Sequence, residues 1–370
     1  MAAMSDARDE MAQIRAALDK ADTALVAALD ARARAVRGFV ALRDRDPGGY
    51  HVLPSAADVV AHATELRKDF PPAGLEPVLR EVLSACAEMI GPVEVVVPEP
   101  EGGFAHLAAR RWFGARAEVR TVDTIPDVFA EIERSRSVHA VVPFETSTEG
   151  ALAATVRALV DTSAKVVGEK TIAVARHLYS RTGNAGDVEK IYGAGSTLAA
   201  CERTLRQRFP GATVLDVRSG VIAAQLALED HGAAAVGSEL LAEIGTTLRP
   251  QGVSGELRPV DKHVDDVTGS VVRFLVLGRL EPRRTGSDRT MLVLGLGEGP
   301  GSLYAALQPF AERGINLTRL ESRPGHGAAW DFFVELDGHV SDRPVLTAID
   351  EVKARARHVK VLGSYPRPER

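Results

Sequence analysis

Cysteine is scarce in this chain: only Cys86 and Cys201 occur among 370 residues. Two cysteines are too few for a disulfide framework or a metal cluster, and they fit a reducing compartment. The 10 histidines are scattered, without the HxxxH or HExxH spacing that places two imidazoles on one helix face. We therefore expect neither a metal nor another cofactor.

Long apolar runs and clustered positive charge are also missing. No apolar stretch approaches the roughly 20 residues that a membrane-spanning helix needs. The formal net charge is −5 and no basic block occurs, so nothing indicates a nucleic-acid surface. The first residues, MAAMSDARDE, are charged and lack the apolar core of a signal peptide. We expect a soluble cytoplasmic protein that binds neither nucleic acid nor membrane.

The first ninety or so residues have a helical pattern. Spacings of three and four place a set of apolar residues on one helix face, namely Ile14, Leu18, Ala21, Leu25 and Leu29. This helix is expected to reach about Asp46, where Pro47–Gly49 breaks it. A second helix begins at Ser55, which has capping-box spacing to Asp58, and a third covers about Leu75 to Ile90. Because a long helix usually buries its apolar stripe against a partner, we expect a dimer.

From Val93 the pattern changes to strands that alternate with helices. The strand candidates are VEVVVPEP, VRTVD, HAVVPFE, KVVGEKTIAVARHLY, KIYGAG, ATVLDV and AAAVGS, and a helix is expected from Ser147 onward. This alternation predicts a mostly parallel, doubly wound sheet, and two lobes would also fit it. Residues 279–290 lack apolar periodicity and are expected to form a linker. From Met291 the order strand, helix, strand, strand, helix, strand predicts a ferredoxin-like βαββαβ sandwich.

The segment PGSLYAALQPFAERGINLTRLESRP, residues 300–324, resembles the ACT domain of P-proteins, which has a PGAL-type turn and an INLTxIESRP strand. The resemblance implies a phenylalanine site at a domain interface. It assigns to that site Gly301, Ser302, Leu303, Asn316, Glu321, Ser322 and Arg323. Gly301 at a helix start lets backbone N–H groups reach a carboxylate, and Arg323 and Glu321 complement the charges of an amino acid. A plain βαββαβ interaction module is the alternative.

Residues 93–281 resemble prephenate dehydratase, which removes the ring hydroxyl and a carboxylate of its substrate together. In that family the threonine of a T-R-F sequence is thought to assist departure of the hydroxyl. The corresponding residues here are Val272, Arg273 and Phe274, so this hydroxyl donor is lost. Loss of a general acid typically costs about 10²–10⁴ in rate.

Other family frames keep their outline but lose hydrogen-bonding side chains. The GPxG-(T/S)-(F/Y)-(S/T)-H frame corresponds to PEPEGGFAH, where Gly103 and Ala105 replace hydroxyl residues. The P-I-E-N-S, H-P-Q and S-T-S frames correspond to residues 143–147, 194–196 and 219–221, which lose amide, ring and hydroxyl groups. These combined losses favour altered chemistry, a different ligand or an empty pseudo-enzyme over an ordinary dehydratase.

The remaining polar residues of this domain fit an anion. The candidates are Arg273, Thr146, Ser147, Ser196 and Ser219, with Glu145 and Arg176 lining the same site by resemblance. Ser147 and Thr148 are expected where a strand meets a helix N-terminus, a favourable position for a carboxylate or phosphate. Arg273 offers a bidentate fork to a carboxylate. The alternatives are that Ser147 caps a helix and that Arg273 forms a structural ion pair.

The segment from Ile14 to Arg43 resembles the first helix of chorismate mutase. By position Arg15, Arg32 and Arg43 match the cations of that family, whose third cation is usually lysine. On one straight helix Arg15 and Arg43 would be about 42 Å apart, so a single substrate needs a second subunit. Near the second helix, where the family has an acid and an Arg-Glu pair, the chain has HVLPSAADVV, and Cys86 and Ile90 replace a Ser and a Gln. Solvent-exposed arginines of a helix surface are the alternative.

The sequence is therefore identified as a divergent member of the P-protein family, a multidomain α and α/β protein. The resemblance implies an all-α chorismate-mutase-like domain (1–92), a two-lobed, periplasmic-binding-protein-like dehydratase domain (93–281) and a ferredoxin-like ACT domain (288–370). We expect action on a chorismate- or prephenate-derived acid with altered chemistry, phenylalanine as effector, and a homodimer or tetramer. The alternatives are a non-catalytic phenylalanine-binding regulator and a functional bifunctional mutase/dehydratase.

Overall fold

The computed structural model describes residues 2–45, 56–135, 138–148, 150–247, 255–279, 281–325 and 330–367. The chain divides into two compact units, one formed by residues 1–93 with 114–116 and the other by 94–113 with 117–370. In the part of the chain that the structure describes, no helix combines the length and the apolar character needed to cross a membrane.

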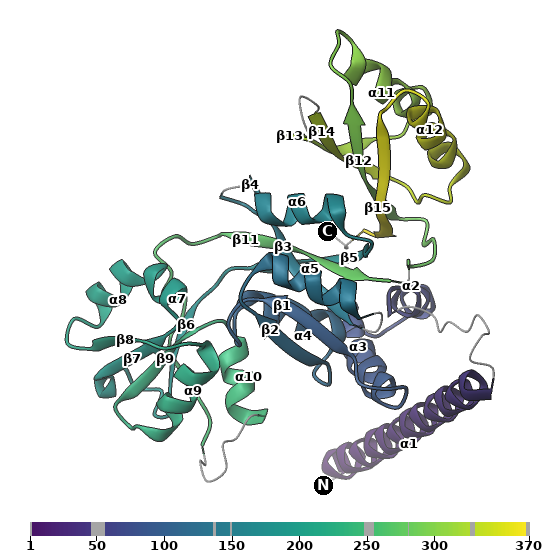
Figure 1. The fold of residues 1–370 in the computed structure, drawn as a ribbon. Coiled ribbons are helices and arrows are strands. Elements are labelled where there is room, and N and C mark those ends of the chain that lie inside the picture. Colours follow the sequence, from purple (N-terminus) through teal and green to yellow (C-terminus); the bar gives the residue numbers. More distant parts are fainter. Residues whose placement is uncertain are drawn as a thin grey trace. The chain divides into compact units, whose positions relative to one another are not determined.

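The described residues of the first unit form the helices α1 (Ala2–Arg45), α2 (Ala56–Leu66) and α3 (Pro72–Glu88) (Figure 1). Both α1 and α2 contact α3. The predicted stripe of α1 lies at the surface of this unit, where Leu18 and Leu25 are 58% and 57% exposed. The predicted break at Pro47–Gly49 and the predicted helix start at Ser55 lie outside the described residues.

The second unit begins with a six-stranded sheet of order β2-β1-β3-β11-β5, in which β4 pairs with β3. Its strands are β1 (Glu94–Pro98), β2 (Glu118–Val122), β3 (His139–Thr146), β4 (Gly150–Ala151), β5 (Lys165–Ala173) and β11 (Val271–Gly278). Helices α4 (Phe104–Phe113), α5 (Ile125–Arg134) and α6 (Ala153–Asp161) pack against it. The strands β1, β2 and β3 are parallel, whereas β11 runs antiparallel to both β3 and β5.

A five-stranded sheet of order β10-β6-β9-β7-β8 forms the second lobe. Its strands are β6 (His177–Ser180), β7 (Lys190–Gly193), β8 (Thr213–Asp216), β9 (Ala233–Gly237) and β10 (Arg258–Asp261). The helical elements are η1 (Ala185–Asp187), α7 (Gly195–Ala199), α8 (Glu202–Arg208), α9 (Gly220–Glu229) and α10 (Leu240–Thr247). Two lobes are thus confirmed. In the main strand order of each sheet only one strand, β11 in the first and β6 in the second, runs antiparallel to both of its neighbours, so the sheets are mixed but mostly parallel in strand direction.

The chain crosses between the lobes twice, after β5 and again before β11. The two crossing segments are bonded to each other: Val264 N donates to Arg176 O at 2.9 Å, and Arg176 N donates to the Asp265 carboxylate at 2.6 Å. The second crossing returns the chain to the first sheet, where β11 fits between β3 and β5.

The predicted start of the helix at Ser147 is wrong. Strand β3 continues to Thr146 and turns back into β4, with Thr146 paired to Gly150. Gly150 has φ of +74°, a left-handed conformation that glycine adopts without a side-chain clash. The helix α6 begins only at Ala153, so Ser147 and Thr148 lie in a hairpin turn.

The C-terminal part has the predicted βαββαβ order, which is confirmed. Its elements are β12 (Asp288–Leu296), α11 (Ser302–Glu312), β13 (Leu317–Pro324), β14 (Trp330–Asp337), α12 (Arg343–Lys353) and β15 (His358–Pro366). The four strands form an antiparallel sheet of order β13-β14-β12-β15, with α11 and α12 packed in one apolar core. Other residues of this sheet, among them Phe333 and Leu362, share a core with Val166 of β5, so the C-terminal sheet packs on the first lobe.

Candidate functional site

The candidate site lies at the edge of the first sheet where β1 and β3 end and β11 begins. Glu99 follows β1, Thr146 ends β3, and Val272 near the start of β11 pairs with Thr146. Ligands of doubly wound sheets bind outside the carboxyl ends of parallel strands, which is this edge. Figure 1 shows β11 entering the first sheet from the side of the second lobe.

The half-buried carboxylate of Glu99 contacts the segment between β1 and α4. Glu99 Oε2 accepts a hydrogen bond of 2.9 Å from Ala105 N. A Cβ atom added at Gly103 would lie 2.4 Å from the same oxygen, so the carboxylate fills the space that a side chain at position 103 would need. Burial raises the pKa of the Glu99 carboxyl, and the N–H groups of Ala105 and Phe104 and the charge of Arg176 oppose that rise.

Sequence reasoning missed Glu99. The signal was present, because a glycine and an alanine replace hydroxyl residues a few positions after an acidic residue. Only the fold shows that the three positions share one space, since Glu99 reaches back over the turn to the start of α4.

Arg176, predicted to line the site, lies on the first crossing segment beside Phe104. Its guanidinium is 5.0 Å from the centre of the Phe104 ring, a cation–π distance. Arg176 Nη1 also pairs with Asp265 on the second crossing at 2.6 Å, and the Asp265 side chain is 3% exposed. Arg176 therefore connects the two crossing segments to the start of α4.

Ser219 and the glycine-rich turn before α4 are brought together at the junction of the lobes. A Cβ atom added at Gly102 would lie 3.4 Å from Gly220 Cα, and Ser238 Oγ donates to Gly102 O at 3.0 Å. The Ser219 hydroxyl caps α9 by accepting from Ile222 N at 3.3 Å. Ser219 thus lies at the junction of the lobes, with its oxygen engaged in the cap.

His106 lies on the first turn of α4 and is 2% exposed. Its Nδ1 accepts a hydrogen bond of 3.2 Å from Gly102 N. Burial and then the positive charge of Arg110 lower the pKa of His106 from 6.5 to about 4, so the ring is neutral near neutral pH.

Thr146 and Ser147 share the turn after β3. Thr146 Oγ1 lies 3.4 Å from Thr148 Oγ1, and Ser147 Oγ accepts from Val271 N at 3.0 Å. Because Ser147 lies in a hairpin turn, neither the predicted helix N-terminus nor the alternative of a helix cap applies to it. Ser196 lies exposed in α7 of the second lobe.

Arg273 is directed toward the C-terminal sheet. Its Nε donates to Glu169 of β5 at 2.7 Å, its Nη1 to Glu335 of β14 at 2.8 Å, and its Nη2 to Tyr365 of β15 at 3.3 Å. Arg289 pairs with the same two carboxylates at 2.6 and 3.5 Å. The glutamates are only 2% and 3% exposed, so the geometry matches the structural ion pair, the alternative interpretation of Arg273.

The residues of the predicted phenylalanine site lie on two elements of the C-terminal sheet. Gly301, with φ of +80°, precedes α11, whose first turn contains Ser302 and Leu303. Strand β13, at the edge of the sheet, holds Glu321, Ser322 and Arg323. Asn316 Nδ2 donates to Asp337 at 3.0 Å, and Arg323 Nη2 donates to Ala151 O of β4 at 3.2 Å.

Known proteins are similar both to the middle of the chain and to nearly its whole length. The sequence model of the prephenate dehydratase family matches residues 98–282. A bifunctional chorismate mutase/prephenate dehydratase of Aquifex aeolicus is 33% identical over 366 residues, which cover 97% of this chain and 98% of that protein.

The chain belongs to the P-protein family of bifunctional chorismate mutase/prephenate dehydratases. A prephenate dehydratase from Arthrobacter aurescens, solved in complex with L-Phe, matches this P-protein homologue with a TM-score of 0.59 and 28% identity, over 74% of this chain and 90% of that one. GqqA, described as a novel type of quorum quenching acylase, also has a TM-score of 0.59, at 24% identity and with 75% and 98% coverage. At that identity the likeness shows a shared fold alone.

The mutase-like arginines of this P-protein homologue lie along α1. Arg15 is exposed, Arg32 is half-buried, and the side chain of Arg43 lies outside the described residues. Because α1 is one helix from Ala2 to Arg45, Arg15 and Arg32 are about 26 Å apart along its axis. No single substrate of chorismate size reaches both arginines of one chain.

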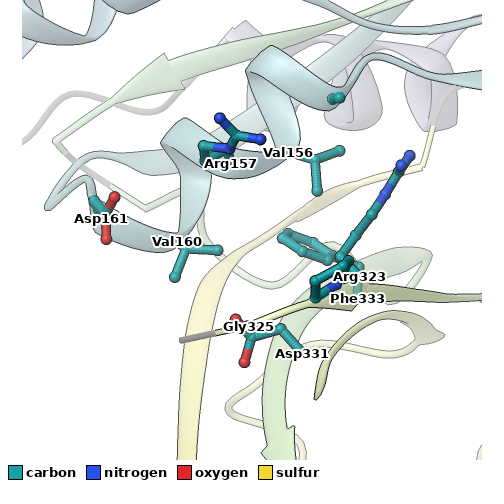
Figure 2. Close-up of a pocket in the computed structure, with 10 residues that line it drawn as sticks. Val156, Arg157, Val160, Asp161, Arg323, Gly325, Asp331 and Phe333 are labelled. Atoms are coloured by element: carbon teal, nitrogen blue, oxygen red, sulfur yellow. The ribbon is translucent and has the colours of Figure 1, made fainter. Parts of the chain in front are cut away.

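A pocket of about 330 Å³ lies between α6 and the strands β13 and β14 (Figure 2). Its lining combines the apolar side chains of Val156, Val160 and Phe333 with charged residues of both signs. The charged residues are Arg157, Asp161, Arg323 and Asp331. Sequence reasoning did not predict this pocket, because α6 and the C-terminal strands are distant in the chain. Among the described residues, no group of three His, Cys, Asp or Glu side chains is placed to hold a metal ion.

Proposed function

We propose that this P-protein homologue acts on prephenate or a closely related chorismate-derived acid with chemistry other than dehydration. Dehydratase and mutase activities are then weak or absent. The observation that carries the proposal is the side chain of residue 272. Val272 pairs with Thr146 at the candidate edge. The family frame has a threonine at position 272, whereas valine has no proton to give to a leaving hydroxyl.

The surroundings support the same proposal. Glu99 occupies the space of a side chain at 103, so the loop before α4 no longer presents the family's hydroxyl there. Thr146, Ser147, Ser196 and Ser219 remain as candidate hydrogen-bonding groups at this edge and in the second lobe. For Arg273 to bind a substrate carboxylate, it would have to leave Glu169 and Glu335, so we assign it to the contact with the C-terminal sheet.

Phenylalanine is proposed as the effector, bound by the residues around Gly301 and by the Glu321–Arg323 segment. A family relative has been solved in complex with L-Phe, which supports this ligand class. Arg319 of β13 contacts Glu145 of β3, and Arg323 of β13 donates a hydrogen bond to Ala151 O of β4. Strand β13 therefore contacts the strands on both sides of the turn that contains Ser147. Coupling of the two sites by about 1–3 kcal/mol is usual for allosteric proteins.

The assembly is proposed to be a homodimer, or a tetramer built from dimers, with α1 as the dimer contact. The proposed domains are residues 1–92, 93–281 and 288–370. Mutase activity would need Arg15, Arg32 and Arg43 from two chains. Near the second helix this chain lacks the acid and the Arg-Glu pair of the family, which supports weak mutase activity.

The test is to incubate the purified protein with chorismate, and separately with prephenate, with and without phenylalanine, and to identify products by mass spectrometry. A product other than phenylpyruvate from prephenate, or other than prephenate and phenylpyruvate from chorismate, supports the proposal. Phenylpyruvate formed at enzyme-like rates would identify an ordinary bifunctional P-protein, the alternative that 33% identity over nearly the full chain favours. Phenylalanine binding without any turnover would identify a non-catalytic regulator, which the engaged Arg273 favours.

A further inference from the structure

Glu99 is a half-buried acid that the family frame does not contain. The frame GPxG-(T/S)-(F/Y)-(S/T)-H places its first glycine at position 99, where this chain has glutamate. The two small residues Gly103 and Ala105 replace hydroxyl residues in the same frame. The structure joins these changes in one place, because the Glu99 carboxylate lies against Gly103 and accepts from Ala105 N.

This carboxylate is held in a fixed position at the junction of the lobes. One oxygen is bonded to the backbone at the start of α4, and the neighbouring Phe104 ring is covered by Arg176 of the crossing segment. Gly102, on the same turn, contacts the start of α9 in the second lobe. A substrate bound between this turn and the edge of the first sheet would meet Glu99 where the family frame has the hydroxyl group of residue 103.

Glu99 does not stand in the place of the missing threonine. The sheet order is β1-β3-β11, so one strand separates the end of β1, where Glu99 follows, from Val272 on β11. Two strand spacings amount to about 10 Å, more than the width of a six-membered ring. A proton from Glu99 therefore reaches a different part of the substrate than a proton from position 272 would.

We propose that Glu99, in its carboxylic acid form, donates a proton to a ring carbon during decarboxylation of prephenate with retention of the ring hydroxyl. The bond between the ring and its carboxylate breaks and carbon dioxide leaves. The electron pair moves through the ring double bonds to a ring carbon, which takes the proton of Glu99. The Glu99 carboxylate then regains a proton from water, and no oxidant or reductant takes part.

This inference rests on the proposed function and names its reaction. Without a proton donor at position 272, departure of the ring hydroxyl is not assisted. The electron pair released by decarboxylation then stays in the ring, and a ring carbon must take up a proton. Burial raises the pKa of the Glu99 carboxyl, which favours the acid form that the step requires.

The experiment compares the full-length protein with the variants Glu99→Gln, Glu99→Asp and Glu101→Gln, using prephenate as substrate in H₂O and D₂O. The amide oxygen of Glu99→Gln still accepts from Ala105 N, whereas Glu101→Gln removes a neighbouring acid and serves as the matched control. We expect the wild type to form prephenate minus carbon dioxide, with one deuterium on the ring in D₂O. Glu99→Gln should lose about 10²-fold or more in kcat with KM little changed. Glu99→Asp should recover part of the rate.

The pH profile separates an acid from a structural residue. In the wild type kcat should fall as the pH rises through the pKa of Glu99, and the residual rate of Glu99→Gln should lack this limb. The same product at an unchanged rate in Glu99→Gln overturns the role of Glu99 and leaves the proposed function intact. Phenylpyruvate as the wild-type product overturns both. No product from prephenate overturns the decarboxylation and leaves the proposed function to the test with chorismate.

Discussion

At position 272 a methyl group of valine stands where the threonine of the family has its hydroxyl group. Restoring it with Val272→Thr changes little in shape, because the two side chains are nearly isosteric. We expect phenylpyruvate formation from prephenate to rise by about 10²-fold, the lower end of what a positioned general acid contributes. Product ratios measured by mass spectrometry check this.

The matched control for that substitution is Val272→Ala, which opens space without adding a donor. If the alanine variant gains phenylpyruvate formation as much as the threonine variant does, extra room rather than the hydroxyl is responsible. Unchanged product in both variants would mean that Val272 does not border the reacting atoms.

His106 is predicted to make stability depend on pH. In the folded protein its pKa is about 4, whereas the ordinary value is 6.5. Between these values the unfolded chain binds a proton that the folded protein does not, so the free energy of unfolding falls as pH drops from 6.5 toward 4. The full shift corresponds to about 3 kcal/mol, measurable by urea unfolding at a series of pH values.

Burial lowers the pKa of other histidines as well, such as His139, so a variant must isolate the contribution of His106. His106→Asn keeps an acceptor for Gly102 N and removes the titration. The variant should lose less stability than the wild type between pH 6.5 and pH 4. Equal losses in the two proteins would show that His106 is not the group responsible.

At the scale of elements, Arg273 connects β11 to β5, β14 and β15 through a buried ionic network. Arg273→Leu leaves Glu169 and Glu335 with one guanidinium, that of Arg289, in place of two. Removing one partner of a buried pair is strongly destabilising, so we expect a loss of about 3 kcal/mol in the free energy of unfolding. Urea unfolding of the full chain measures it.

The control for this loss is Arg206→Leu. Arg206 pairs with Glu202 at the surface of α8, where the side chains are 75% and 57% exposed. Exposed pairs of this kind contribute less than about 1 kcal/mol. Similar losses in the two variants would contradict a special role for the network around Arg273.

Periodicity predicted most elements correctly, and its failures have local causes. The βαββαβ order of the C-terminal part follows from clear alternation and helical spacing. The start of α6 was misplaced because the apolar pattern after Ser147 continues without a break, whereas the turn at Gly150 depends on a left-handed φ. Alternation along a strand puts Val272 and Arg273 on opposite faces, but the partners of Arg273 lie some sixty to one hundred residues away in sequence.

Prediction of the candidate site from the sequence is limited in the same way. Motif frames follow the chain and therefore named Thr146, Ser147, Ser219 and Val272 as candidates. The fold then places these residues at the edge of the first sheet or at the lobe junction. Contacts across a turn or between domains do not follow the chain. The Glu99 carboxylate in the space at Gly103 and the pocket between α6 and β14 therefore appeared only in the fold.

At the scale of the whole molecule, the two crossings between the lobes explain why the sheets are mixed. A strand that returns from the other lobe need not follow the direction of the strands beside it. Strand β11 lies between β3 and β5 and runs antiparallel to both. Val271–Gly278 is not among the strands that periodicity predicts, and no pattern along the chain identifies its neighbours in the sheet. The same return places β11 between the candidate edge and the C-terminal sheet, which makes it the element through which effector binding would reach the site.

The apolar stripe of α1 predicts how chains associate. On this 44-residue helix Leu18 and Leu25 are more than half exposed in the single chain, and a partner would bury them. We expect the wild type to have at least the mass of a dimer by light scattering, and Leu18→Glu with Leu25→Glu to shift it toward half that mass. Ala16→Glu with Ala27→Glu adds the same charge on the opposite face of α1 and should leave the mass unchanged. A wild type that is monomeric at micromolar concentration, or a control pair that dissociates equally, would show that α1 is not the dimer contact.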